Sequence, residues 1–496
     1  MSGRRRPPRH GHRNRKNKEE KPEGDGETNE NEDANEGEED KEEKESNQTD
    51  GTPNISEKKR PQKEKKPKKP TNYLDSIDIS DESSITFVFH PDELSLKGKN
   101  RPQFEEILAD NIRFLLRHAG VTRLKIQRLQ QRFFVTVPLA DEQKAYDVAH
   151  HVFGVSNFAR CYSLPRDLDT LCSRCVEHIR SVLTQRPIES FRVETSRVDK
   201  RYPMKSPEIS SRVGSVIHET LKIPVNLTKP SFTLHIECLD TAFVFFSERI
   251  EGAKGLPIRS SGRIACLLSG GFDSPVMVWM MMRRGCDCTL IHFHAAPFGG
   301  WRSSVSKVRK IVSVLREWGG PSKFYAIAIG EQQRQIAEKA PARLRVTLYR
   351  RLMVRIAVKI MEKHKCDALA TGDSLGQVAS QTCESMTTIQ EAIAPTLIFR
   401  PLLGFTKEEI MRRAQEIGTK QFSELEGGDC CSHMLPKKVA TKPSIEDAKT
   451  GEENLDIPNM VKAAVDGAQL IDINDPWNDE EDDAQGEACP LFSFEE

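Results

Sequence analysis

The residues best suited to chemistry lie in a short loop between an apolar strand and a helix. A strand is predicted over residues 264–268, and it runs directly into Ser269-Gly270-Gly271-Phe272-Asp273-Ser274-Pro275. Paired glycines allow a tight turn that exposes consecutive N–H groups, and the N-terminus of the following helix adds partial positive charge. Ser269 and Ser274 add hydroxyl donors, and Pro275 suits a first helical turn because its missing N–H costs nothing there. The pattern predicts a site for an anion of the size of pyrophosphate.

A second candidate for chemistry is the vicinal pair Cys430-Cys431, which follows the turn-like stretch 427–429. The reactivity of a cysteine depends on its thiolate character and exposure, and such a stretch is typical of an exposed loop. The chain has 12 unevenly spaced cysteines, which favours thiols over a disulfide framework. Cys172 and Cys175 have metal-ligand spacing, but they fall on a predicted helix without a second pair nearby, so we expect no metal there.

From residue 263 onward, strands and helices alternate, which is typical of a parallel sheet flanked by helices. In such sheets ligands bind at the carboxyl ends of the strands. Leu267 and Leu268 close the strand before the loop, and His292 and Phe293 close the next strand along the chain. We therefore expect both pairs to meet the same ligand.

Two α/β segments precede this region. Residues 81–165 show a β-α-β-β-α pattern that suggests a ferredoxin-like unit, and a second unit spans 145–250, overlapping by its first helix. A Gly-rich linker is predicted over 251–262. Basic residues gather in these units and favour contact with a nucleic-acid backbone: Lys97, Lys99, Arg101, Arg197, Lys200, Arg201, Lys205 and Arg212.

Several motifs, in the same order along the chain, resemble one family. The loop 269–274 lacks a Walker lysine and resembles the PP-loop of ATP pyrophosphatases. The segment Glu93–Arg101 and the run Thr371–Thr382 look like motifs of the tRNA 4-thiouridine synthetases, and Arg197–Pro203 looks like part of a THUMP domain, an RNA-binding module. Further matches are Gly255-Leu256-Pro257, Arg350-Arg351-Leu352-Met353 and Asp429-Cys430-Cys431-Ser432. The resemblance spans residues 85–443.

The resemblance implies a Rossmann-like α/β PP-loop domain with a parallel sheet over 263–443, preceded by α+β ferredoxin-like and THUMP domains. It implies that ATP is split between its α and β phosphates to adenylate a uridine, at position eight of tRNA, with Asp273 placing Mg²⁺. The implied ATP contacts are Leu267, Leu268, Ser269, Gly270, Gly271, Asp273, Ser274, His292, Phe293, Arg350, Gly372 and Gln381.

The same resemblance assigns a persulfide to Cys431. Many relatives carry a C-terminal rhodanese domain that receives the sulfur, whereas the segment after residue 443 looks too short and too acidic for one, so we expect a cysteine desulfurase to load Cys431 directly. A second thiol must resolve the persulfide, and Cys430 and Cys383 are the candidates. The run 297–301 departs from the relatives' Pro-Pro-(Tyr/Phe)-Thr-Ser, which leaves that loop unassigned.

Two other functions stay open on the sequence. One is sulfur transfer to a ubiquitin-like carrier protein for thiamine thiazole synthesis, and the other is a tRNA-binding protein without catalysis. An intact phosphate loop and Cys431 argue against the second, since both would decay without selection. The resemblance also implies that a homodimer is possible.

The distribution of charge indicates the character of the two ends of the chain. Lysine plus arginine equals aspartate plus glutamate, 74 against 74, so net charge indicates no partner. Residues 1–80 form basic and acidic blocks that cannot bury a core, and we expect them to be a disordered tail, as we do the acidic residues 444–496. Neither an apolar run of about 18 residues nor a secretory signal is present, so we expect a cytoplasmic protein without a membrane span.

Overall fold

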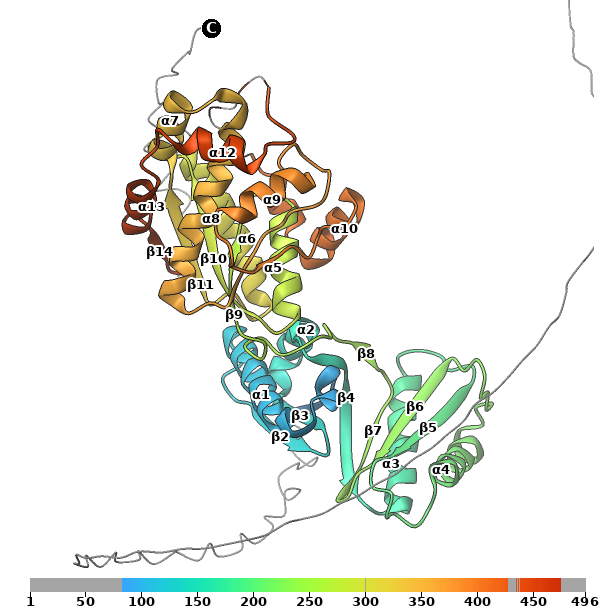
Figure 1. Cartoon of the computed structure of the whole chain (residues 1–496). Coiled ribbons are helices and arrows are strands. Elements are labelled where there is room, and N and C mark those ends of the chain that lie inside the picture. The colour runs from blue at the N-terminus through green and yellow to red at the C-terminus, as the bar shows by residue number, and fades with distance from the viewer. Residues whose placement is uncertain (1–82, 299, 427–433, 435, 437, 474–496) are drawn as a thin grey trace, which may run out of the picture. The chain divides into compact units, whose positions relative to one another are not determined.

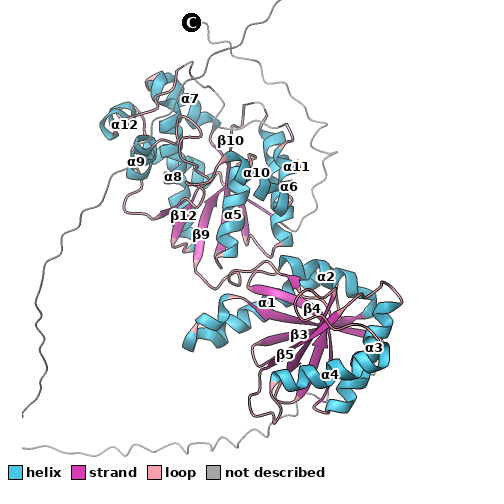
Figure 2. Cartoon of the chain, turned by 90° about the vertical axis from the view of Figure 1, so that its right-hand side faces the viewer, coloured by secondary structure: helices cyan, strands magenta, loops and turns pink. Residues whose placement is uncertain are grey.

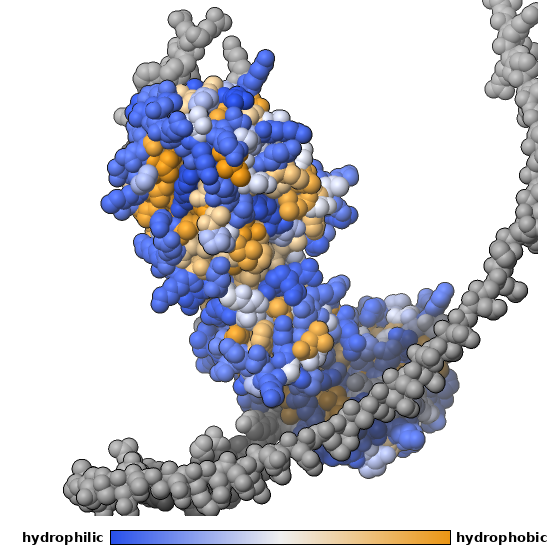
Figure 3. Space-filling view, viewed as in Figure 1, coloured by the Kyte–Doolittle hydropathy of each residue, from blue (hydrophilic) through white to orange (hydrophobic). Residues whose placement is uncertain are grey.

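The computed structural model describes residues 83–298, 300–426, 434, 436 and 438–473 of the 496 residues. Predictions for the tail 1–80, for the end of the chain after 473 and for Cys430 and Cys431 therefore lie outside the described residues. Within the described residues, no helix is long and apolar enough to cross a membrane. On the face seen in Figure 3, hydrophobic residues lie in small groups among hydrophilic ones.

The two α/β segments that precede the PP-loop share one eight-stranded sheet. Its strands are β1 (Ser84–Pro91), β2 (Lys125–Leu129), β3 (Arg132–Pro138), β4 (Val155–Pro165), β5 (Phe191–Arg197), β6 (Phe232–Cys238), β7 (Ala242–Phe246) and β8 (Ile250–Glu251). The order is β2-β3-β1-β4-β7-β6-β5, with β8 paired to β4. The accompanying helices are α1 (Arg101–His118), α2 (Glu142–His151), α3 (Leu168–Leu183) and α4 (Ser206–Leu221). Figure 1 shows these strands and helices.

Strand β4 joins the two halves of this sheet, and the sequence pattern did not predict it. Its first part pairs with β1 and its second part with β7. Phe158 packs in the core with α1 and α2, whereas Leu164 packs in the core with α3 and α4. Because the strand changes its packing partners halfway, its apolar residues do not alternate cleanly with polar ones, and the period-2 signal is lost. Cys172 and Cys175 are buried in the same core as Leu164.

The remaining chain forms a six-stranded sheet in the order β13-β12-β9-β10-β11-β14. The strands are β9 (Arg263–Leu267), β10 (Asp287–His294), β11 (Lys323–Ala328), β12 (Ala368–Ala370), β13 (Ile398–Phe399) and β14 (Gln469–Ile471). Strands β9 to β13 pair in parallel, as predicted, but β14 runs antiparallel to β11. The predicted parallel sheet over 263–443 is confirmed, and β14, which lies beyond that range, adds an antiparallel edge strand.

Helices cover both faces of this sheet (Figures 1 and 2). Ile264 and Cys266 of β9 pack with α5 (Asp273–Arg283), α6 (Trp301–Glu317) and α10 (Lys407–Ile417). Ala265, between them, faces the opposite core, as the alternation of side chains along a strand requires. That opposite core is built with α7 (Gly330–Lys339), α8 (Arg345–His364), α9 (Cys383–Glu391), α12 (Ile445–Glu452) and α13 (Ile457–Asp466). The result is a three-layer α/β/α unit, which is the expected fold class.

Residues 444–473 are part of this unit, so the prediction that the disordered tail begins at 444 was wrong. They form α12, α13 and β14. Met460, Val461 and Ala464 of α13 are buried against α8 and its neighbours. The acidic composition of the segment as a whole concealed this short apolar stripe at helical spacing.

A buried ion-pair network fastens α12 to α8. The guanidinium of Arg351, which is 1% exposed, donates to Glu452 at 2.8 Å and to Glu391 at 3.0 Å, and Arg355 also pairs with Glu452. We expect Glu452→Gln to lower the free energy of unfolding by about 3 kcal/mol, because it leaves a buried arginine with only part of its counter-charge. Chemical denaturation of Glu452→Gln beside Glu453→Gln, whose side chain is exposed, measures this. Equal stability of both variants would contradict the assigned role of the network.

Candidate active site

A cavity of about 490 Å³ opens where β9, β10 and β12 end. All but one of the predicted nucleotide contacts line it: Leu267, Leu268, Ser269, Gly270, Asp273, Ser274, His292, Phe293, Arg350, Gly372 and Gln381. The remaining one, Gly271, is the next residue of the same loop and is exposed. The structure thus brings together residues that lie as much as 114 positions apart (381 − 267 = 114), at the edge of the sheet where a parallel α/β fold binds its ligands.

The hydroxyl of Ser274 closes the loop on itself. It accepts a hydrogen bond from the backbone N–H of Ser269 at 2.8 Å and donates to the Ser269 carbonyl at 3.1 Å. Gly372 then packs directly on this turn, since a Cβ at that position would lie 2.9 Å from Cα and N of Ser274. The Ser274 hydroxyl therefore stabilises the turn of the loop. Gly372 lets the backbone after β12 pack against the backbone of Ser274.

His292 is held by both ring nitrogens. Nδ1 lies 3.0 Å from the Leu268 carbonyl and Nε2 lies 3.1 Å from the hydroxyl of Ser304. A carbonyl only accepts, so Nδ1 carries the proton and Nε2 accepts from Ser304. Burial lowers the pKa of His292 to about 4, so the ring is neutral near pH 7. Its place in the cavity wall is as predicted, but its polar atoms are used to fix the end of β9.

Asp273 is engaged by two residues that the sequence did not indicate. Nζ of Lys407 donates to its carboxylate oxygens at 2.9 and 3.2 Å, and Nε2 of Gln377 donates at 3.0 Å. Lys407 is the first residue of α10. A cation in the first turn opposes the helix dipole, so its position was a usable signal that an anion lies nearby. Asp273 is thus the centre of a small polar cluster at the start of α5.

A second carboxylate, Asp373, orients Arg350. Arg350 donates to Asp373 at 2.5 Å and to the Ser380 carbonyl at 3.1 Å, while Nε of Arg400 lies 3.3 Å from the other carboxylate oxygen. Burial raises the pKa of Asp373, but Arg350, Thr371 and Arg400 outweigh that effect and hold the pKa below its usual range. The carboxylate therefore stays charged and fixes the arginine fork at the cavity wall. Neither Asp373 nor Arg400 was predicted.

The donors and acceptors of the cavity fit a nucleotide. Side chains of Phe293, Val346 and Met353 supply apolar wall for a flat ring. The Oε1 atoms of Gln377 and Gln381 are buried without a hydrogen-bond partner in the described part of the chain, which is typical of a site that is completed by a ligand. The described residues contain no cluster of three or more metal-ligating side chains.

The predicted RNA-binding cations divide into free-standing and engaged groups. Lys99, Lys200, Arg201 and Lys205 are exposed, although Arg201 also bonds Asp199 at 2.8 Å. Others are used within the protein: Lys97 lies over the ring of Phe104, Arg101 pairs with Glu105, Arg197 donates to the carbonyls of Tyr202 and Met204, and Arg212 pairs with Asp169. Arg197 therefore shapes the loop between β5 and α4, which presents Lys200, Arg201 and Lys205.

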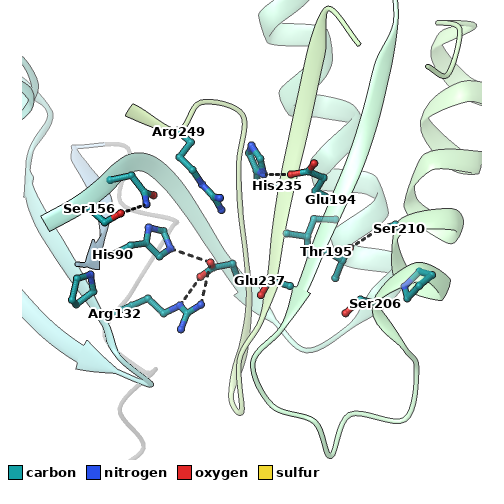
Figure 4. A pocket seen from close by; sticks show the side chains of 15 residues that line it. His90, Arg132, Ser156, Glu194, Thr195, Ser206, Ser210, His235, Glu237 and Arg249 are labelled. Atoms are coloured by element: carbon teal, nitrogen blue, oxygen red, sulfur yellow. Dashed lines mark hydrogen bonds and ion pairs between the residues drawn. The ribbon is translucent and has the colours of Figure 1, made fainter. Parts of the chain in front are cut away.

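A second cavity, of about 590 Å³, lies where β1, β3 and β4 face β5, β6 and α4. On its floor the carboxylate of Glu237 accepts from His90 at 3.0 Å and from Arg132 at 2.8 Å (Figure 4). Burial raises the pKa of Glu237, but His90 and Arg132 outweigh it and bring the pKa to about 2. Arg249 and the ion pair His235–Glu194 complete the wall. The sequence did not predict this polar cavity, because its residues come from six separate helices and strands and a loop.

Comparison with known proteins agrees with this division of the chain. Residues 86–159 match the family model of the ThiI ferredoxin-like domain, residues 165–247 that of the THUMP domain, and residues 259–457 that of the thiamine biosynthesis protein ThiI. The last match extends past residue 443, in keeping with the ordered segment that carries α12.

The chain is also similar to curated proteins over nearly their whole length. The chain is 38% identical to a probable tRNA sulfurtransferase of Brevibacillus brevis over 77% of its own length and 94% of the relative. It is 36% identical to a probable tRNA sulfurtransferase of Alkaliphilus oremlandii, covering 77% and 97%.

Among solved structures, a crystal structure of a 4-thiouridine synthetase–RNA complex with bound ATP matches with a TM-score of 0.70 and 31% identity. The match covers 78% of this chain and 99% of that one. Because nearly the whole length of these relatives is covered at more than 30% identity, and because the ThiI ferredoxin-like, THUMP and ThiI models all match this chain, it belongs to the ThiI family of tRNA sulfurtransferases.

Proposed function

We propose that the protein uses ATP to activate a uridine of tRNA at O4 and replaces that oxygen with sulfur carried as a persulfide on Cys431, which yields 4-thiouridine at position eight. The observation that carries this proposal is the cavity at the PP-loop, where an anion cradle, two fixed carboxylates and an apolar wall meet. The likeness to a 4-thiouridine synthetase bound to RNA and ATP supports the same choice of substrates.

In the first step, O4 of the uridine attacks the α-phosphorus of ATP, pyrophosphate leaves and the N3 proton is released. The PP-loop and the side chain of Arg350 line the cavity, and Lys407 contacts Asp273 in its wall; these groups would neutralise the charge that develops on the phosphates. When bound, Mg²⁺ would add charge neutralisation at the departing pyrophosphate, with Asp273 as its protein ligand.

In the second step, the terminal sulfur of the Cys431 persulfide attacks C4, the C4–O4 bond breaks and AMP departs with the oxygen. A second thiolate then attacks Sγ of Cys431. The electron pair of the broken S–S bond stays on the sulfur bound to C4, N3 regains a proton, and a protein disulfide remains. An external dithiol reduces that disulfide, and a cysteine desulfurase reloads the cysteine with sulfur.

For tRNA binding we propose the exposed cations of the THUMP half together with the second cavity. Lys200, Arg201 and Lys205 lie on one loop beside α4, and Arg249 faces the cavity in Figure 4. Phosphate contacts of this kind position an RNA by shape and charge without reading its sequence.

A tRNA-dependence assay tests the adenylation step. Purified protein with ATP should release AMP and pyrophosphate only when unmodified tRNA is present, and a transcript with cytidine in place of the uridine at position eight should be inert. With a desulfurase and cysteine added, nucleoside mass spectrometry should find 4-thiouridine. Adenylation of a ubiquitin-like carrier protein in place of tRNA would overturn the proposal in favour of sulfur transfer for thiamine thiazole synthesis. The matching family model is that of a thiamine biosynthesis protein, so this alternative is included in the test.

A further inference from the structure

Lys307 of α6 contacts both the PP-loop and the segment that follows α11. Its side chain is buried, at 9% exposure, and its Nζ donates to the carbonyl of Leu425 at 2.7 Å. The aliphatic part of the same side chain packs on Gly270, because a Cβ there would lie 3.1 Å from both Cδ and Cε of Lys307. Lysine is rarely buried to this degree unless its charge is partnered, so the contact with Leu425 is a built feature of the loop region.

A second contact connects the same two segments. The hydroxyl of Ser423, the last residue of α11 (Lys420–Ser423), donates to the carbonyl of Gly271 at 3.2 Å. Ser423 is also buried, at 6% exposure. Neighbouring glycines of the PP-loop are thus each tied to the segment 423–425, one through a hydroxyl and the other through the lysine.

The segment held in this way leads along the chain to the cysteine pair. Leu425 precedes Cys431 by six residues. A fully extended stretch of six residues spans at most about 22 Å, at about 3.6 Å per residue. Fixing Leu425 to the loop that receives the triphosphate therefore restricts where a sulfur on Cys431 can be delivered.

We propose that Lys307 is a positioning residue for the sulfur-transfer half of the reaction. It fixes Leu425, which leads along the chain to Cys431, relative to the PP-loop, so that the activated uridine and the persulfide meet. This inference rests on the function proposed above and adds a residue that acts through Leu425. A different role, direct binding of ATP phosphate by the ammonium group, makes the opposite prediction for ATP affinity.

The test separates the two half-reactions in Lys307→Met, which keeps the packing on Gly270 and removes the donor. We expect KM for ATP and tRNA-dependent ATP–pyrophosphate exchange to stay within about twofold of wild type, while 4-thiouridine formation falls about tenfold or more, since a misplacement of about 1 Å is enough for such losses. AMP released per 4-thiouridine formed should rise accordingly. Lys307→Arg should restore part of the coupling, and Lys310→Met, on the same helix, should behave as wild type.

Ser423→Ala provides a milder version of the same test and covers the case in which Lys307→Met does not fold. It should lower 4-thiouridine formation by about two- to fivefold without raising KM for ATP, in line with the loss of one hydrogen bond. Equal losses in exchange and sulfur transfer, or a raised KM for ATP, would overturn the proposal and make Lys307 a phosphate ligand or a purely structural residue. Wild-type protein that releases AMP without forming 4-thiouridine would instead refute the proposed function, independently of any variant.

Discussion

Cys431→Ala is expected to abolish 4-thiouridine formation and to leave tRNA-dependent ATP–pyrophosphate exchange intact. Alanine removes the only atom that can carry the persulfide at this position, whereas the described residues that line the PP-loop cavity stay unchanged. The measurement is single-turnover sulfur transfer with nucleoside mass spectrometry, alongside exchange. A variant that still transfers sulfur would show that another cysteine is the carrier.

Cys430→Ala and Cys383→Ala serve as the matched comparisons and identify the resolving thiol. Among the described free cysteines, Cys383 is the exposed one, whereas most others are buried, and burial raises the pKa of thiols such as Cys286 to about 12. The variant that lacks the resolving thiol should complete one attack on C4 and then stop with RNA linked to protein through a disulfide. That adduct should be released by added dithiol, and its absence in both variants would indicate that an external thiol resolves the persulfide.

Asp273→Asn should produce the second large effect, a loss of about 10²- to 10³-fold in tRNA-dependent exchange, because the variant removes a fixed charge from the site where pyrophosphate develops. Asparagine preserves the size of the side chain, and it can still accept a hydrogen bond from Lys407. The loss should therefore appear in kcat and in the Mg²⁺ concentration needed for half-maximal exchange, with little change in thermal stability.

Asp287→Asn is the control for this variant. Asp287 is the first residue of β10, at the opposite end of that strand from the PP-loop cavity. Its carboxylate lies 3.9 Å from Nε of Arg263. It should retain exchange activity close to wild type. If Asp273→Asn kept full activity at low Mg²⁺, the assignment of Asp273 to the metal and pyrophosphate would be wrong.

The sequence was sufficient to predict the part of the site that is local. A buried strand, a Gly-rich turn and a helix start lie next to one another along the chain, and parallel strands bring their carboxyl ends to one edge, so Ser269, Asp273 and Phe293 were predicted together and lie together. The resemblance to a known family extended this to Arg350 and Gln381, which no local pattern could have placed at the same cavity.

What the sequence did not predict depends on long-range partners. Lys407 meets Asp273 across 134 positions, and Arg400 meets Asp373 only after the chain has folded round β13. Without its partner, Arg400 looks like an ordinary surface charge, and Lys407 differs from one only by its place at the start of a helix. The same reason explains why α12 was assigned to a disordered tail. The side chain of its acidic residue Glu452 is only 11% exposed because it pairs with Arg351 and Arg355 of α8.

The most direct test of the account is the amount of 4-thiouridine in tRNA from a strain that lacks this gene, complemented with the wild type or with Cys431→Ala and measured by mass spectrometry. The account predicts that the wild type restores the nucleoside and that the variant, expressed to the same level, does not. Failure of the wild type to restore it, with purified protein still turning over ATP, would contradict the assignment of tRNA as the sulfur acceptor.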